Sequence, residues 1–135
     1  MSPWVEIVLR FLLAAGLGAG IGYQRERAGK AAGLRTHILV SAGAALFTLV
    51  SIYGFSDAVV DVSRVAAGVV VGIGFIGAGV ILRGQREKEV AGLTTAASIW
   101  ITAAVGLAAG AGMYLISVIA AAVTVGVLFL PKVRG

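Results

Sequence analysis

Long apolar stretches alternate with short polar segments along the whole chain. Five stretches have the length and composition of membrane-spanning helices, and they cover Trp4–Tyr23, Ile38–Phe55, Val65–Leu82, Leu93–Ala109 and Met113–Leu130. The third contains neither a charge nor a hydroxyl group, and as an α-helix it would cover about 27 Å of hydrocarbon. The pattern predicts an all-α membrane protein, built as a bundle of about five transmembrane helices.

The composition supports a bilayer as the solvent of this chain. Only 13% of its 135 residues are charged, whereas soluble domains average about 25%. There is no cysteine, which excludes disulfides, thiolate metal sites and cysteine nucleophiles. The net charge of +5 does not indicate nucleic-acid binding, because the basic residues sit in short loops between apolar spans. We expect one transmembrane domain over residues 1–135.

The basic residues gather on one side of the predicted bundle. Nine of the eleven lie in the loops after the first and third spans and in the C-terminal tail: Arg25, Arg27, Lys30, Arg35, Arg83, Arg86, Lys88, Lys132 and Arg134. An odd number of spans puts these three segments on the same side, and basic loops remain cytoplasmic. We therefore expect the N-terminus outside and the C-terminus in the cytoplasm.

The third span is rich in glycine. Its glycines are Gly68, Gly72, Gly74, Gly77 and Gly79. At about 100° per residue, those at 68, 72 and 79 share one face and the other two lie nearly opposite. Small residues let transmembrane helices approach closely, as also expected for the pairs Gly16 with Gly20 and Gly18 with Gly22 in the first span. We expect the third span to be the centre of the bundle, with the first and fourth spans against its glycines.

Residues 72–77 also spell G-x-G-x-x-G, which marks a dinucleotide site when it follows a strand and opens a helix. Here the flanks are continuously apolar, and no acidic residue follows about 20 positions later. We interpret these glycines as helix-packing positions.

The densest polar cluster lies between the first and second spans. Its candidate functional residues are Arg25, Glu26, Arg27, Arg35, Thr36 and His37. The cluster can serve solely as a topology signal that contacts lipid headgroups. Alternatively, Gly29 and Gly33 let the loop fold back, so that Glu26 and Arg35 tie it to the ends of the third and fourth spans. An exposed His37 would titrate near neutral pH and could sense it, whereas a helix-start histidine would bond a backbone carbonyl.

Charged pairs occur at the predicted outer ends of two helices. Asp61 and Arg64 begin the third span, where the acid would cap the helix. Asp61 could instead bind a cation together with Asp57 and Glu6, since Mg²⁺ needs only one or two carboxylates. Glu6 and Arg10 have the spacing and order of an intrahelical pair, and Arg10 is otherwise a functional candidate as an intramembrane charge.

Hydroxyl side chains form a stripe on the fourth span. Its members are Thr94, Thr95, Ser98 and Thr102, within an arc of about 100°. The hydroxyls could bond to carbonyls one turn earlier, or the stripe could line a narrow path or meet the third span. The chain has one histidine and lacks an acid pair within any span, so we do not expect an enzyme.

Three segments carry motifs in a characteristic order: QRERAGKAAGLRTHILVSAGAALFTLVS at 24–51, RVAAGVVVGIGFIGAGVILR at 64–83 and GLTTAASIWITAAVGL at 92–107. Together they resemble the membrane domain of the MgtC/SapB family of bacterial inner-membrane proteins. The resemblance implies a multi-pass inner-membrane protein linked to growth under magnesium limitation and to virulence. It also implies action on other membrane machinery, including the ATP synthase, rather than proven magnesium pumping.

The chain departs from the family pattern at three places. Ala31 and Val62 stand where proline is common, and the soluble C-terminal domain of MgtC-type members does not follow Leu130. A short SapB-like member is therefore the better comparison, although the chain could be a fragment of a longer protein. We expect a non-enzymatic homo-oligomer that modulates other membrane proteins. The alternative is a transporter or channel for Mg²⁺ or another cation.

Overall fold

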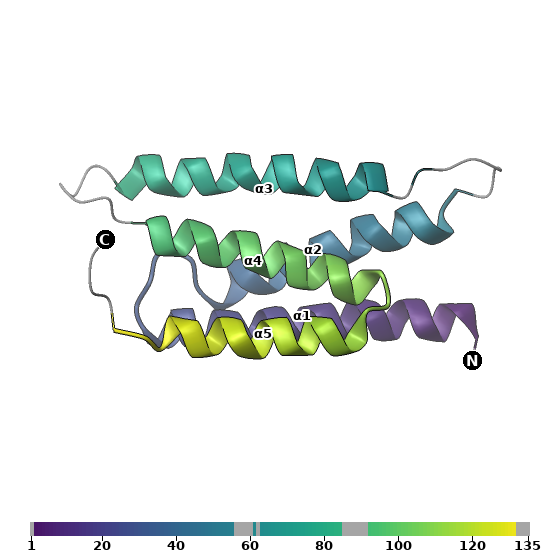
Figure 1. Ribbon diagram of the computed structural model, residues 1–135, viewed down its shortest axis with the longest axis horizontal. Helices are drawn as coiled ribbons and strands as arrows, with labels where there is room; N and C mark the ends of the chain where they lie inside the picture. The colour runs from purple at the N-terminus through teal and green to yellow at the C-terminus, as the bar shows by residue number, and fades with distance from the viewer. Residues whose placement is uncertain (1, 56–60, 62, 85–91, 132–135) are drawn as a thin grey trace.

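The computed structural model describes residues 2–55, 61, 63–84 and 92–131 (Figure 1). All regular structure in these ranges is helical, and the elements are α1 (Pro3–Arg27), α2 (Leu34–Tyr53), α3 (Ser63–Gly84), α4 (Leu93–Gly110) and α5 (Tyr114–Leu128). This confirms the predicted all-α fold and the order of its helices. The first four helices are long and apolar enough to cross a membrane, and α5 is apolar but shorter.

Successive helices run in opposite directions along the long axis (Figure 1). Glycine makes the tight reversals possible: Gly112, between α4 and α5, has a φ of 86°, which side chains with a Cβ rarely adopt. We call the end where α1 begins the outer end, and the end where α2 and α4 begin the inner end, following the orientation expected from the basic residues.

The polar loop after the first span is shorter than expected. Helix α1 continues through Arg27, four residues beyond the last apolar position, and α2 already begins at Leu34. Residues 24–27 and 34–36 are therefore helical, and only residues 28–33 connect the two helices. As a consequence, Arg25 and His37 are held at fixed positions on helix faces.

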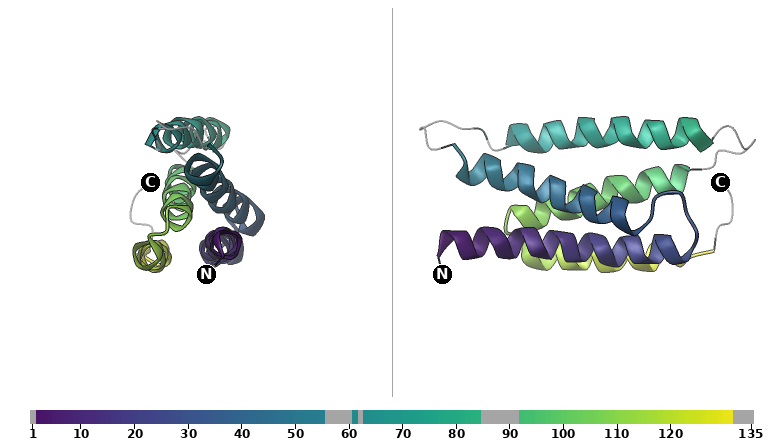
Figure 2. Two further views of the ribbon diagram at one scale, coloured as in Figure 1. Left: turned by 90° about the vertical axis from the view of Figure 1, so that its right-hand side faces the viewer. Right: turned by 180° about the vertical axis from the view of Figure 1, so that it is seen from behind.

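Helix α4 is the centre of the bundle, and the prediction that the third span occupies this place is wrong. In the end-on view, α3 lies on one side, α2 and α4 lie in the middle, and α1 and α5 lie on the other side (Figure 2). Helix α4 contacts all four other helices, whereas α3 contacts only α4 and α2 in the described part of the chain. In the most apolar 18-residue stretch of each helix, 56% of α4 is buried inside the bundle, compared with 6% of α3.

The glycines confirm this arrangement. A Cβ added at Gly68, Gly72, Gly74 or Gly79 would meet nothing within 4 Å, and only one at Gly77 would touch α4, at 3.5 Å from the Ala96 Cβ. The expected contact of these glycines with the first span is therefore absent from the described chain. Close helix approach depends instead on four other glycines, which lie on α1 and α4 against α2: Gly18, Gly22, Gly106 and Gly110.

Most side chains in the core are small or polar, with a few larger apolar ones such as Ile21 and Ile99, while most large apolar side chains point outward. Two buried clusters are built around Ala14, Ala45 and Ala109 and around Ile21, Val105 and Ala121. Large side chains are exposed on every helix, as with Phe75, whose exposed fraction is 82%. This distribution suits a bundle whose outer surface contacts lipid.

Candidate functional site

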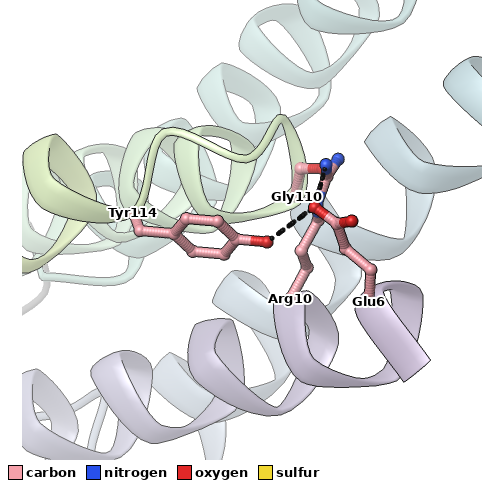
Figure 3. Close-up of polar contacts among 4 residues, drawn as sticks. All are labelled: Glu6, Arg10, Gly110 and Tyr114. Atoms are coloured by element: carbon pink, nitrogen blue, oxygen red, sulfur yellow. Dashed lines mark hydrogen bonds and ion pairs between the residues drawn. The ribbon is translucent and has the colours of Figure 1, made fainter. Parts of the chain in front are cut away.

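At the outer end, an ion pair within α1 is hydrogen-bonded to the last residue of α4 and the first residue of α5 (Figure 3). The Nη2 of Arg10 donates to Oε1 of Glu6 at 2.7 Å, which confirms the intrahelical pair. Arg10 also donates through Nη1 to the carbonyl of Gly110 at 3.1 Å and through Nε to the hydroxyl of Tyr114 at 3.2 Å. That hydroxyl in turn donates to Glu6 at 3.0 Å. The charge of Arg10 is thus matched by one carboxylate and two further acceptors.

The sequence pattern identified Glu6 and Arg10 but did not identify their partner Tyr114, which lies more than a hundred residues away. The Arg10 guanidinium also lies over the rings of Tyr53, at 5.6 Å, and Tyr114, at 6.0 Å. Cations at such distances interact favourably with aromatic faces. The arrangement connects α1 to α2, α4 and α5, and Glu6 accepts hydrogen bonds from two donors.

Asp61 caps α3. Its Oδ1 accepts hydrogen bonds from the backbone N–H of Ser63 at 3.0 Å and from the Ser63 hydroxyl at 2.6 Å. These two bonds, and less so the nearby charge of Arg64, lower the pKa of the Asp61 carboxyl. The capping interpretation is therefore confirmed. Asp57 lies outside the described residues, and within them no three His, Asp or Glu side chains gather as a metal site would need.

At the inner end, polar side chains from three helices meet inside the bundle. Arg25 of α1, His37 of α2, and Thr95 and Ser98 of α4 form what we call the inner polar cluster. Their exposed fractions are 3%, 0%, 4% and 2%, respectively. Arg25 Nη2 donates to Thr95 Oγ1 at 2.8 Å, and His37 Nε2 lies 2.9 Å from Ser98 Oγ. The sequence predicts all four residues as candidates, from separate segments, but does not indicate that they meet.

Hydrogen-bond accounting constrains the protons of this cluster. The Nδ1 of His37 lies 2.8 Å from the carbonyl oxygen of Gly33, which only accepts, so Nδ1 carries a proton. The Ser98 hydroxyl has one proton and two acceptors, His37 Nε2 and the Thr95 carbonyl at 2.7 Å. A neutral His37 requires Ser98 to donate to Nε2. Donation to the Thr95 carbonyl instead requires a proton on Nε2 and therefore a cationic His37.

The hydroxyl stripe of α4 faces α1 and α2 rather than α3. Thr102 donates to the Ser98 carbonyl at 2.6 Å, so its hydroxyl bonds one turn back, as one of the two interpretations expected. Thr94, the first member of the stripe, is exposed. Towards the outer end the stripe continues as Gly106 and Gly110, at which α2 approaches α4 closely. The buried hydroxyls therefore belong to a helix-packing seam.

Glu26 turns back, but to a different partner from the one expected. Its Oε1 accepts the backbone N–H of Leu34 at 3.0 Å, which satisfies a donor in the first turn of α2. Arg35 is exposed and Thr36 is half-buried. Arg27 is also exposed and donates to the Tyr23 hydroxyl at 3.1 Å. Among the described residues, no hydrogen bond or ion pair links Glu26 or Arg35 to the third or fourth span, and Arg25 and His37 bond to α4 instead.

Comparison with known proteins gives a consistent set of relatives. A family model described as the MgtC family matches residues 11–134. "Putative magnesium transporter YhiD" of Escherichia coli K12 is 49% identical over 129 residues, which cover 91% of this chain and 59% of that protein. "Protein SrpB" of Synechococcus elongatus is 44% identical over 87% of this chain and 70% of its own length. "Protein MgtC" of Salmonella typhimurium LT2 is 44% identical over 84% and 46%.

The chain thus spans about half to two thirds of the length of these relatives. No solved structure matches it.

Proposed function

This chain belongs to the MgtC family of multi-pass bacterial inner-membrane proteins, and we propose that it is a non-enzymatic protein that binds and modulates other membrane proteins. The setting we propose is magnesium limitation, including the virulence-related setting that the resemblance implies. By the same resemblance, the ATP synthase is a candidate partner, and a homo-oligomer is the form that we expect to act.

One observation carries this proposal: the polar groups that could line an ion path are used in helix packing. Ser98 and Thr102 of α4 are buried and bonded to carbonyls or to His37. Further along the seam, a Cβ at Gly106 would overlap the Ser41 carbonyl of α2, so the two backbones touch there. A path between α2 and α4 would require these helices to separate.

The outward face of α3 gives this protein a surface for neighbours in the membrane. Val71 and Phe75 have exposed fractions of 74% and 82%, and four of the helix's five predicted packing glycines leave open space beside them. Such a face accommodates either lipid or another transmembrane helix. It supports a role in which the protein acts by contact within the bilayer.

Two measurements on the full chain test the proposal. Proteoliposomes loaded with a magnesium-sensitive dye should show no saturable Mg²⁺ uptake above that of empty vesicles. A photo-crosslinking amino acid at Phe75 should capture a membrane protein in magnesium-starved cells, whereas the same group at the buried Val105 should not. Saturable Mg²⁺ uptake that falls on Ser98→Ala would contradict the proposal.

The alternative is transport of Mg²⁺ or another cation by this chain. The name of the E. coli relative favours this alternative. In that case Asp61, exposed at the outer end, would receive the cation, and Asp61→Ala would lower the uptake measured in the same proteoliposomes.

A further inference from the structure

The N-terminus of α4 is an uncapped helix end beside a buried cation. Gly92 occupies the N-cap position with a φ of 92° and has no side chain that could accept a hydrogen bond. The first backbone bond of the helix runs from Ala96 N to Gly92 O at 2.8 Å. The N–H groups of Leu93, Thr94 and Thr95 have no acceptor within the described part of the chain. Such groups, together with the helix dipole, give a helix N-terminus an affinity for anions.

The buried cation is Arg25. Arg25 has an exposed fraction of 3%. It reaches this helix end through its bond to Thr95 Oγ1 at 2.8 Å. A guanidinium has five N–H donors, and the buried Nε of Arg25 has no hydrogen-bond partner in the part of the chain that the structure describes. The ion pair of the described residues is that of Arg10 with Glu6, so no described carboxylate lies beside Arg25.

Within the described ranges, the buried guanidinium of Arg25 is held by one neutral hydroxyl, and such an arrangement is costly. Removing a charge from water is strongly unfavourable unless an opposite charge and hydrogen bonds replace the lost hydration. Here two features of positive character, the guanidinium and the helix N-terminus, converge on one place and increase that cost. An anion between them would offset both.

We propose that the inner end of the bundle contains a site for a phosphate group, held by Arg25 and the first turn of α4. Phosphate oxygens accept hydrogen bonds from backbone N–H groups at helix N-termini and from the guanidinium fork of arginine. The exposed Arg27, Lys30 and Arg35 raise the local concentration of anions around this end. The site does not depend on whether the protein modulates partners or transports a cation.

The depth of the site fits a lipid headgroup as well as a free ion. Helix α1 has 25 residues, and at 1.5 Å per residue its length of about 37 Å exceeds the hydrocarbon core of about 30 Å. Arg25 is the third residue from the end of this helix, which places it near the level of the headgroup phosphates. A lipid headgroup and a free ion would both present a phosphate oxyanion to this site, and the experiment below distinguishes between them.

The test uses the full chain in nanodiscs of neutral phosphatidylcholine. There are two probes. One is phosphatidylglycerol in the bilayer, and the other is inorganic phosphate in the buffer, compared with chloride at equal ionic strength. We expect at least one probe to raise the melting temperature of the wild type by about 5 °C at saturation. Arg25→Gln should weaken the binding of that probe about tenfold or more, since a charge-assisted bond is lost.

Arg27→Gln is the matched control, because it removes the same charge from an exposed position two residues away. It should retain the response of the wild type. If Arg25→Gln does not fold, hydrogen exchange on the wild type decides: the probe should protect the amides of Leu93, Thr94 and Thr95. Response to the lipid alone identifies a headgroup site, and response to phosphate alone identifies a site for the free ion.

The proposal is overturned if neither probe changes the wild type, or if Arg25→Gln and Arg27→Gln respond alike. It is also overturned if Glu87→Gln or Glu89→Gln creates a response to the probes that the wild type lacks. That result would mean that a carboxylate of residues 85–91, which lie outside the described ranges, already occupies the place of the anion.

Discussion

Arg25 of α1 is buried and Arg10 of the same helix is half-buried, and their charges are matched to different degrees. Arg10 has Glu6, the Tyr114 hydroxyl and the Gly110 carbonyl as partners, whereas Arg25 has the Thr95 hydroxyl. The pair of Arg10 with Glu6 could be predicted, because a four-residue spacing fixes the geometry within one helix. The burial of Arg25 could not, because it depends on how the end of α1 is rotated against α4.

The Tyr114 hydroxyl can be tested by its removal. Tyr114→Phe removes the bond from Arg10 and the bond to Glu6, so it should lower the free energy of unfolding by about 1 kcal/mol. Tyr23→Phe is the control, since the hydroxyl of Tyr23 bonds only the exposed Arg27 in the described structure. Thermal unfolding in detergent should show a smaller loss for Tyr23→Phe. Equal losses would contradict a structural role for the contacts among Glu6, Arg10, Gly110 and Tyr114, which we call the outer cluster.

The bond between Ser98 and His37 provides a second test. Ser98→Ala leaves the buried Nε2 of His37 without a partner, which should cost about 1–3 kcal/mol of stability. Ser117→Ala is a matched control: Ser117 is also fully buried, but among the described residues its hydroxyl bonds only the Tyr114 carbonyl of its own helix. Unfolding of both variants in the same detergent compares the two sites. The expectation fails if Ser117→Ala is at least as destabilising as Ser98→Ala.

At the scale of the helix, the apolar pattern predicted where helices occur but not which helix is central. In a soluble protein the buried face of a helix is the apolar one, whereas a transmembrane helix is apolar on both its lipid-facing and its protein-facing sides. The glycines of α3 therefore predict packing within the bundle from the sequence, although most of them lie beside open space in the structure. The better signal was the continuous four-residue spacing of α4, in which Ser98, Thr102, Gly106 and Gly110 all point into the bundle.

This difference predicts opposite effects for two glycine substitutions. A Cβ at Gly106 would overlap the backbone carbonyl of Ser41, which cannot move without separating α2 from α4. Gly106→Ala should therefore lower stability by about 3 kcal/mol or prevent folding. A Cβ at Gly72 would meet nothing within 4 Å, so Gly72→Ala should leave the thermal stability unchanged or slightly raised. If Gly72→Ala lowered the stability, the prediction would be contradicted, and the face of α3 that carries Gly72 would have to be packed against protein.

At the scale of the whole molecule, the two polar clusters lie at opposite ends of an alternating bundle. The outer cluster joins α1 to the turn between α4 and α5, and the inner cluster joins α1 and α2 to the beginning of α4. Helix α4 takes part in both, so its contacts fix the relative positions of the helices at each end. Function at the inner end depends on which side of the membrane that end faces. The expected orientation rests on the distribution of basic residues along the chain.

Cysteine labelling tests the orientation directly, because the chain has no cysteine of its own. Ser2 precedes α1 at the outer end, and Lys30 is exposed in the connection to α2 at the inner end. If basic loops stay in the cytoplasm, a membrane-impermeant maleimide should label Ser2→Cys in intact spheroplasts and Lys30→Cys only after permeabilisation. The reverse pattern would place Arg25 and the first turn of α4 outside. A phosphate group bound there would then come from the outer leaflet or the periplasm rather than from the cytoplasm.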